Sequence, residues 1–217
     1  MTTKNFSLVM PKEGRDEVFE AAEREHEQRE KFYERNMRLR NAGLEGTVTD
    51  DDHRRIMRNQ LEETQCLQML RGWLKGDAPL FVLLGPTGRG KTVACAWAIA
   101  ESGGRYMTAK KLERLFLAQY GVALDEQDQT MQYQGLLVVD DVGTELKRDQ
   151  FTSSLYELVN ARQGAGRRTV ITSNMGRKEF EGRYRDARLL SRLKRAEFAQ
   201  IAGSDLREKD RKDKREK

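Results

Sequence analysis

A glycine-rich segment at residues 85–92 constrains the fold of this chain more than any other feature. It reads Gly-Pro-Thr-Gly-Arg-Gly-Lys-Thr, it follows the apolar run at residues 80–84, and a helical pattern continues from it through residue 100. A buried strand, a glycine loop and a helix in this order are the context in which such a loop holds phosphate groups. The glycines let the backbone fold tightly around phosphate oxygens, and the positive end of the helix faces the same anion. The segment therefore predicts a nucleotide-binding α/β domain.

The residues of this loop have separate expected roles toward ATP and Mg²⁺. Lys91 should reach the β- and γ-phosphates, and Thr92 should place its hydroxyl on the metal ion. The alternative is a chance glycine-rich turn, which the strand before it and the helix after it disfavour. The predicted ATP-binding residues of the loop are Gly85, Pro86, Thr87, Gly88, Arg89, Gly90, Lys91, Thr92 and Val93.

Short apolar runs alternate with helical patterns through the middle of the chain. Strands are predicted at residues 80–84, 105–108, 136–140, 168–172 and 197–201, and helices at residues 91–100, 110–119 and 150–161. This alternation implies a parallel sheet covered by helices on both faces. The predicted fold class is α/β, a P-loop NTPase with a five-stranded parallel sheet between helices.

The two ends of the chain are dominated by charge. Residues 1–48 are predicted to form a charged helical arm that ends near Gly43, and residues 49–207 the ATPase domain, which opens with a helix from residue 49 to about residue 76. Residues 208–217 are expected to be a disordered tail. The arm is either a solvated helix or a segment that binds a partner protein.

Composition sets broad limits on the class of protein. The chain has 217 residues, a net charge of +5 and two cysteines, Cys66 and Cys95, which are too far apart for a zinc cluster and are interpreted as small buried apolar residues. A mildly basic chain is compatible with a nucleic-acid partner without specifying one. No segment approaches the roughly 20 apolar residues of a membrane span. These observations favour a cytoplasmic protein.

Two acidic residues lie at the carboxyl end of the strand predicted at residues 136–140. Asp140 and Asp141 should lie near the phosphate loop, because ligands of parallel α/β sheets bind at the carboxyl ends of the strands. Asp140 is then expected to hold Mg²⁺, and Asp141 to orient or deprotonate the attacking water. Asp is also common in ordinary turns, so this interpretation depends on the phosphate loop. Asn174, after the next strand, is a further candidate for contact with the water or the γ-phosphate.

An ordered set of motifs resembles one family of AAA+ ATPases. The motifs are residues 85–92, residues 136–143, Thr172-Ser173-Asn174, Leu190-Ser191-Arg192-Leu193 and Gly203-Ser204-Asp205-Leu206-Arg207. In this order they resemble the DnaC-type helicase loaders and the IstB-type transposition helpers, over about residues 50–207. The resemblance implies that Asn174 is a sensor, that Arg192 is an arginine finger for a neighbouring subunit, and that Arg207 is a second sensor.

The resemblance also implies a function. It implies loading of a replicative helicase of the DnaB type onto single-stranded DNA, with self-association through the ATPase domain. The alternatives are a transposition helper that recruits a transposase and an ATP-binding adaptor with negligible turnover. One departure bears on the last alternative, because the family usually has Asp-Glu where this chain has Asp140-Asp141. Arg192 itself lies in a basic stretch that is otherwise typical of a solvated surface.

Overall fold

A parallel sheet of five strands forms the centre of the molecule. The computed structural model describes residues 12–117 and 122–203. The strands are β1 (Leu80–Leu84), β2 (Gly104–Thr108), β3 (Leu136–Asp140), β4 (Thr169–Ser173) and β5 (Glu197–Gln200), in the spatial order β2-β3-β4-β1-β5. All four strand pairs are parallel. The predicted five-stranded parallel sheet is confirmed.

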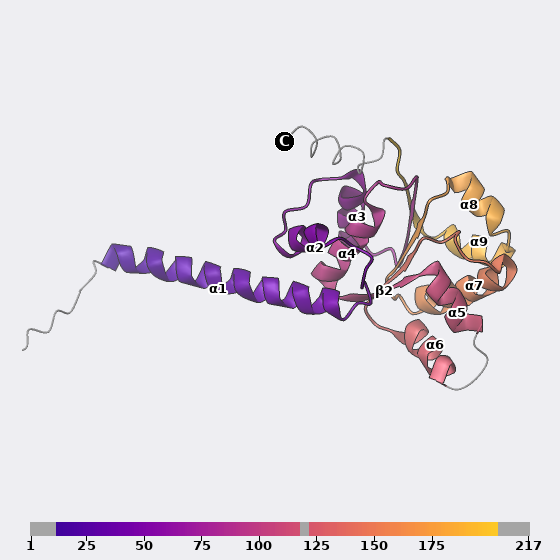
Figure 1. Ribbon diagram of the computed structural model, residues 1–217, viewed down its shortest axis with the longest axis horizontal. Coiled ribbons are helices and arrows are strands. Elements are labelled where there is room, and N and C mark those ends of the chain that lie inside the picture. Colours follow the sequence, from indigo (N-terminus) through magenta and orange to yellow (C-terminus); the bar gives the residue numbers. More distant parts are fainter. Residues whose placement is uncertain (1–11, 118–121, 204–217) are drawn as a thin grey trace, which may run out of the picture.

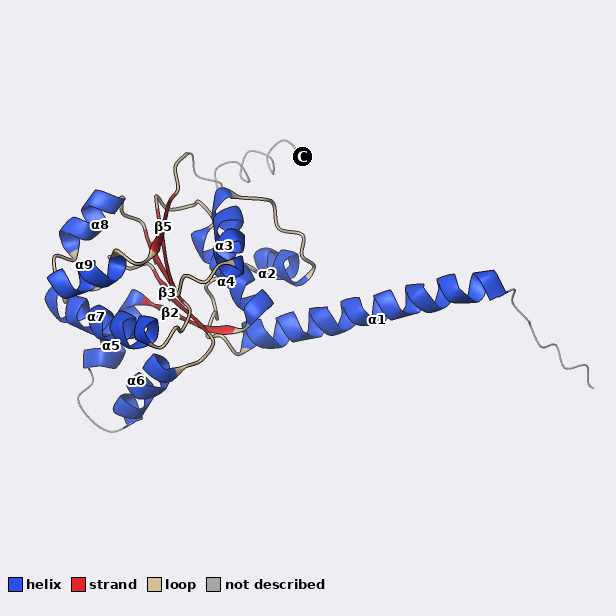
Figure 2. Ribbon diagram, turned by 180° about the vertical axis from the view of Figure 1, so that it is seen from behind, coloured by secondary structure: helices blue, strands red, loops and turns tan. Residues whose placement is uncertain are grey.

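Helices cover both faces of this sheet (Figures 1 and 2). One face packs on α4 (Lys91–Ser102), α3 (Gln65–Lys75) and α2 (Asp50–Met57). The other face packs on α5 (Ala109–Leu117), α7 (Arg148–Gly164), α8 (Arg177–Arg183) and α9 (Ala187–Leu193), with α6 (Val122–Gln132) beside α5 and α7. Side chains of each strand alternate between these two layers, so the strands are apolar on both faces.

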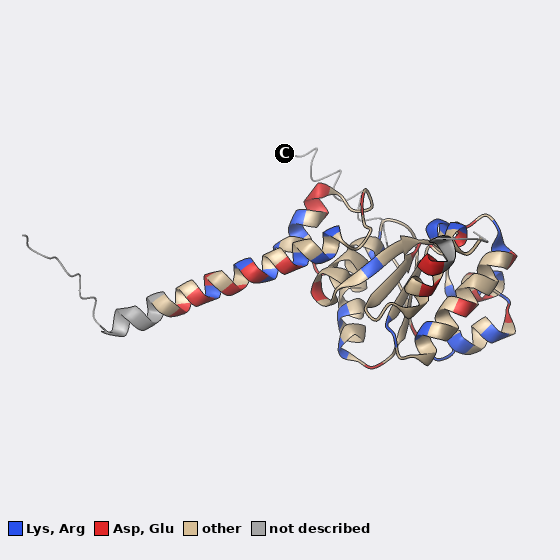
Figure 3. Cartoon of the chain, turned by 90° about the horizontal axis from the view of Figure 1, so that it is seen from below, with Lys and Arg blue, Asp and Glu red and all other residues tan. Residues whose placement is uncertain are grey.

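The first helix, α1 (Lys12–Arg40), extends away from this body (Figure 1). Acidic and basic residues are interspersed along it (Figure 3). Ion pairs one turn apart, such as Arg29–Glu25, stabilise an exposed helix. Its last turns do contact the body: Arg35 pairs with Glu101 at 2.5 Å, and Leu39 is buried in the core under α4. The predicted polar helix is confirmed and ends at Arg40, three residues before the predicted Gly43.

The single helix predicted from residue 49 to about residue 76 is wrong. The structure has two helices, α2 and α3, separated by a segment in which Asn59 has a left-handed φ of 53°. The hydroxyl of Thr49 accepts a hydrogen bond from the amide of Asp52, and that of Thr64 accepts one from the amide of Leu67. Each threonine therefore starts a helix of its own, which a continuous apolar spacing concealed.

The basic stretch near the carboxyl end packs on the body through its apolar residues, while some of its arginines pair with acids at the surface. It forms two short helices, α8 and α9, which bury Phe180, Leu189 and Leu193, with Tyr184 buried between them. Asp186 caps α9 by accepting hydrogen bonds from the amides of residues 188 and 189. The arginines are exposed or half-buried around this apolar set, so burial rather than charge fixes the segment.

A buried arginine hydrogen-bonds to backbone groups at the amino-terminal ends of the strands β3 and β4. Arg162, near the end of α7, is 0% exposed and donates hydrogen bonds to Thr169 and to the carbonyl oxygens of residues 130, 133, 135 and 168. Burial lowers the pKa of Arg162 to about 10. Because five acceptors compensate its desolvation, this side chain ties α7 to the starts of β3 and β4.

Three smaller expectations concern cysteines, membrane spans and the tail. Both cysteines are buried, as predicted. Among the described residues, no helix is long and apolar enough to cross a membrane. The tail expected at residues 208–217 and the second sensor expected at Arg207 lie outside the described residues.

Candidate nucleotide-binding site

The glycine loop joins the carboxyl end of β1 to the first turn of α4. Gly85, Gly88 and Gly90 have φ values of 139°, 72° and 78°, which side-chain-bearing residues rarely adopt. At Gly85 a Cβ atom would also lie 2.6 Å from the carbonyl oxygen of Ile201. The predicted strand, loop and helix are therefore all present, and the loop depends on glycine for its path.

Lys91 is directed back into this loop. Its Nζ atom donates hydrogen bonds to the carbonyl oxygens of Gly85 at 2.7 Å and Pro86 at 2.8 Å, and to Oδ1 of Asn174 at 2.8 Å. Burial lowers the pKa of Lys91, and the carboxylates of Asp141 and Asp140 oppose that effect in part. A cation held among backbone carbonyls at the mouth of a loop is placed to exchange them for phosphate oxygens.

Asp140 is the most enclosed acid of the site, with 1% of its surface exposed. Its carboxylate accepts three hydroxyl hydrogen bonds: from Thr92 at 2.8 Å, from Tyr106 at 2.6 Å, and from Thr172. Burial and the neighbouring Asp140 raise the pKa of the Tyr106 phenol, so this hydroxyl stays a donor. Thr92 lies on α4, Tyr106 on β2 and Thr172 on β4, so three elements fix one carboxylate.

Asp141 and Asn174 lie next to Asp140 and Lys91 and hydrogen-bond to each other. Asp141 has a φ of 56°, a left-handed conformation that Asp tolerates better than most residues. Asn174 Nδ2 donates to Asp141 Oδ1 at 3.1 Å, and the Asp141 amide donates to the hydroxyl of Thr172 at 3.1 Å. Because Oδ1 of Asn174 also accepts from Lys91, one amide side chain bridges the lysine and the second acid.

The donor set of this site suits Mg²⁺ bound together with a nucleotide. The Thr92 hydroxyl and the Asp140 carboxylate are oxygen ligands 2.8 Å apart, and Mg²⁺ in nucleotide sites takes one or two protein oxygens plus phosphates and water. Within the described part of the chain, no group of three or more His, Cys, Asp or Glu side chains forms a metal site without a nucleotide. The residues present therefore fit an ion that binds with the phosphates.

Arg89 does not point toward the other site residues. Its guanidinium donates to the carbonyl oxygen of Ala202 and lies beside Gly203, in the segment after β5. The thiol of Cys66 donates to the Arg89 carbonyl oxygen at 3.0 Å, and burial raises the pKa of this thiol to about 11. Cys66 on α3 thus fixes the backbone of the glycine loop at Arg89 through this hydrogen bond. Its position in the sequence alone did not predict this role.

The structure brings five predicted residues together and leaves one apart. Lys91, Thr92, Asp140, Asp141 and Asn174 form one connected hydrogen-bond network. Arg192 is remote from it: its carbonyl oxygen accepts from Gln163 Nε2, in the last turns of α7. The carboxyl end of α7 leads to the start of β4, at the amino-terminal ends of the strands. The glycine loop lies at their carboxyl-terminal ends, on the opposite side of the sheet. Arg192 therefore cannot serve the nucleotide site of its own chain.

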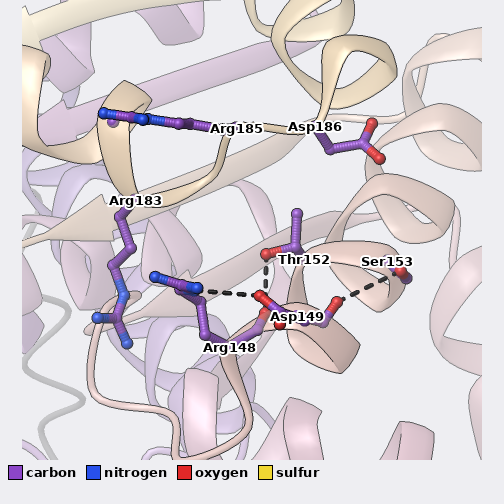
Figure 4. Close-up of a pocket in the computed structure, with 8 residues that line it drawn as sticks. Arg148, Asp149, Thr152, Ser153, Arg183, Arg185 and Asp186 are labelled. Atoms are coloured by element: carbon purple, nitrogen blue, oxygen red, sulfur yellow. Dashed lines mark hydrogen bonds and ion pairs between the residues drawn. The ribbon is translucent and has the colours of Figure 1, made fainter.

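A pocket of about 580 Å³ lies away from this network, between the start of α7 and the α8–α9 connection (Figure 4). Its charged lining residues are Arg148, Asp149, Arg183, Arg185 and Asp186. Arg148 pairs with Asp149 at 3.1 Å, and Arg183 pairs with the buried Glu145 at 2.8 Å. None of the residues that line this pocket belongs to the network of Lys91, Asp140, Asp141 and Asn174.

The order of the strands, the glycine loop and the paired acids define a P-loop ATP-binding protein of the AAA+ fold. The family model described as "IstB-like ATP binding protein" matches residues 15–214. The chain belongs to this family. A search of curated protein sequences gives no significant match to the chain.

Solved structures show the same fold at low sequence identity. DnaA of Aquifex aeolicus bound to AMPPCP matches with a TM-score of 0.55 and 18% identity, over 72% of this chain and 53% of that one. DnaI matches with 0.52 and 18%, over 77% and 94%. The DnaC helicase loader matches with 0.50 and 20%, over 76% and 99%. The chain spans about half the length of the replication initiators it matches.

Proposed function

We propose that the chain binds and hydrolyses ATP at residues 85–93. The observation that carries this proposal is the network joining Lys91, Asn174, Asp141 and Asp140 across three adjacent strand ends. It joins a cation for the phosphates, a carboxylate for the metal and a second carboxylate for water. These are the parts that phosphoryl transfer in P-loop ATPases requires.

Each side chain then has one task. The Lys91 ammonium exchanges the carbonyl oxygens of Gly85 and Pro86 for β- and γ-phosphate oxygens. Thr92 and Asp140 would hold Mg²⁺, which supplies charge neutralisation at those phosphates. Asp141 orients the attacking water and accepts its proton. Asn174 fixes the position of Asp141 relative to Lys91 by hydrogen-bonding to both.

We further propose that ATP binding serves the loading of a replicative helicase of the DnaB type onto single-stranded DNA. Two observations support this proposal. DnaI and the DnaC helicase loader match over most of their own length, and DnaA has been solved with AMPPCP and single-stranded DNA. The long exposed α1 contacts the body through its last turns, and residues 19–34 of the helix give a partner protein an accessible surface. In this proposal α1 binds the helicase, and the site at the carboxyl ends of the strands binds ATP.

A transposition helper is the second candidate. The IstB-like family description favours it, because it extends over nearly the whole chain. A helper would bind double-stranded DNA and a transposase and would use the same nucleotide site. The two functions therefore differ in the partner and in the DNA that stimulates turnover.

The nucleotide proposal is tested by ATP hydrolysis with the purified chain. Lys91→Ala should reduce turnover to background, whereas Lys110→Ala, an exposed lysine on α5, should leave it unchanged. Turnover that survives Lys91→Ala would contradict the site. Tight ATP binding by the wild type with no turnover under any condition would favour a nucleotide-dependent adaptor instead.

The partner proposal needs a separate measurement. We expect single-stranded DNA to stimulate hydrolysis more than double-stranded DNA, and a purified DnaB-type hexamer to be delivered to a single-stranded circle in an ATP-dependent manner. The Lys91→Ala variant is the matched control, because it retains α1 and loses the nucleotide response. Stimulation by double-stranded DNA together with capture of a transposase would replace the loader by the helper.

A further inference from the structure

Tyr106 contacts both the proposed nucleotide site, at Asp140, and the segment that follows α1, at Ala42. The proposed function gives these two parts separate tasks. It lies on β2, is 4% exposed, and packs in the core layer under α4. Its register partner on β3 is Val138, and Asp140 lies two residues further along the same face of that strand. The phenol therefore reaches diagonally across the strand pair to Asp140 Oδ2, at 2.6 Å.

The same carboxylate oxygen also accepts the hydroxyl of Thr92, at 2.8 Å. If Thr92 turns its hydroxyl oxygen to a metal ion, Asp140 retains the hydrogen bonds from Tyr106 and Thr172. Hydrogen-bond donors behind a ligand fix its orientation and so set the affinity of a metal site. Tyr106 is in that position relative to Asp140.

The other side of Tyr106 contacts the segment that follows α1. The Tyr106 amide donates to the carbonyl oxygen of Ala42 at 2.7 Å, and a Cβ atom at Gly43 would lie 3.2 Å from the Tyr106 carbonyl oxygen. The side chain of Thr47 acts on the Tyr106 phenol and lowers its pKa, against the larger effect of burial, which raises it. Residues 42 and 43 thus hold the backbone of Tyr106, and Thr47 acts on its side chain.

Residues 42–47 follow the last turn of α1, where the Ala42 amide donates to the carbonyl oxygen of Leu39 at 3.2 Å. Arg38, in the last turn of α1, donates to the carbonyl oxygens of Ala100 at 3.1 Å and Glu101 at 2.5 Å, at the end of α4. Leu39, Ala42 and Leu44 are buried in the same core layer as Tyr106. A continuous path of packed and hydrogen-bonded groups therefore runs from the base of α1 through Thr47 and Tyr106 to Asp140.

We propose that Tyr106 is a positioning residue for Asp140, and that Thr47 at the base of α1 sets its orientation. This inference rests on the proposed Mg²⁺–ATP site and adds the route by which a partner bound to α1 changes that site. Each step of this path joins neighbouring groups of the chain. The path begins at α1, which is proposed to bind a partner, and ends at Asp140, which is proposed to hold Mg²⁺. The affected quantity is the Mg²⁺ requirement of nucleotide binding, because Asp140 would hold the metal ion, whereas Lys91 and the loop would hold the phosphates.

The test measures the binding of a fluorescent, slowly hydrolysed ATP analogue at a series of Mg²⁺ concentrations and in EDTA. We expect Tyr106→Phe to raise the Mg²⁺ concentration for half-maximal binding about tenfold while leaving the affinity in EDTA unchanged. Thr47→Val, at a half-buried site, should raise it about threefold and add nothing in the Tyr106→Phe background, as expected for two residues acting in series. Tyr133→Phe, on the far side of the sheet, is the matched control.

An unchanged Mg²⁺ requirement in Tyr106→Phe overturns the inference alone, provided that the wild type depends on Mg²⁺. An effect of Thr47→Val that persists in full without the Tyr106 hydroxyl overturns the path from α1. Wild-type binding with no dependence on Mg²⁺ would instead remove the proposed metal site and this inference together. Circular dichroism and thermal unfolding show whether each variant is folded at the assay temperature.

Discussion

Lys91 and Asn174 are joined by a hydrogen bond of 2.8 Å between Nζ and Oδ1, although 83 residues separate them in the chain. Lys91 lies in the first turn of α4, which follows β1, and Asn174 directly follows β4, the neighbour of β1 in the sheet. The other end of the Asn174 amide donates to Asp141. Asn174 therefore relates the position of Lys91 to that of Asp141.

Loss of this bridge should slow catalysis more than it weakens binding. Asn174→Ala removes both contacts of an exposed side chain, so the fold should be unaffected. We expect the rate of a single turnover to fall about 100-fold, because an oriented polar group at the reacting centre is lost. The affinity for ATP should stay within about threefold of the wild type, since the loop and Lys91 remain. A matched Gln134→Ala variant, also exposed, should change neither; equal losses of binding and rate in Asn174→Ala would contradict a role in the chemical step.

Replacing Asp141 by the family's usual glutamate should have opposite effects on rate and stability. The longer side chain carries the carboxylate about one methylene closer to a water at the γ-phosphate, and we expect hydrolysis to accelerate about tenfold. Residue 141 is left-handed, with a φ of 56°, which Glu tolerates less well than Asp, so unfolding free energy should fall by about 1 kcal/mol. Steady-state hydrolysis and urea unfolding measure the two effects. A slower Asp141→Glu enzyme would show that the aspartate already has the productive length.

The sequence predicts this site well where chemistry follows directly from a strand end. Lys91 follows the loop after β1, Asp140 is the last residue of β3, and Asn174 follows β4. Parallel strands bring their carboxyl ends together on one side of the sheet. Their mutual contacts are therefore a consequence of topology that can be worked out before any coordinates exist. The five-stranded sheet was predictable for the same reason, since apolar runs and helices alternate along the chain.

Residues whose roles depend on register or on a neighbouring element were not predictable in this way. Tyr106 reaches Asp140 only because β2 and β3 pair with Thr108 opposite Asp140, and one sequence does not specify that alignment. Asn59 breaks a regular apolar spacing by adopting a left-handed conformation, which no periodicity reveals. Cys66 and Arg162 act through burial beside distant segments. In each case tertiary context overrides the local pattern.

A buried acid behind the site makes stability depend on pH. Glu145, whose side chain is 0% exposed, accepts hydrogen bonds from Tyr184 at 2.7 Å, from the Gly143 amide at 2.8 Å and from Arg183. Burial raises the pKa of the Glu145 carboxyl, but these hydrogen bonds outweigh burial, so the pKa lies below its usual value. The stabilisation is therefore present above the unfolded-state pKa, near about 4.3, and is lost as pH falls through the folded-state pKa.

Glu145→Gln should consequently lower the unfolding free energy by about 2 kcal/mol at pH 7, with a difference that shrinks toward zero below about pH 4. Urea unfolding of both proteins at a series of pH values measures this convergence. Glu179→Gln, on the exposed surface of α8, is the control and should give a small difference at every pH. A difference that stays constant from pH 7 to acid conditions would assign the loss to packing rather than to the charge.

The position of Arg192 leads to a prediction about pairs of subunits. A five-residue strand spans roughly 15 Å, longer than an arginine side chain, and Arg192 lies at the edge opposite the phosphate loop. If it acts as an arginine finger, it acts on a neighbouring subunit, and Arg192→Ala and Lys91→Ala should each be inactive alone. Mixed in equal amounts, they should recover activity, because roughly a quarter of the interfaces then pair an intact loop with an intact finger. Hydrolysis measured against the mixing ratio gives the result, with Arg195→Ala as the matched basic control. An inactive mixture of subunits that still associate would exclude a finger at Arg192.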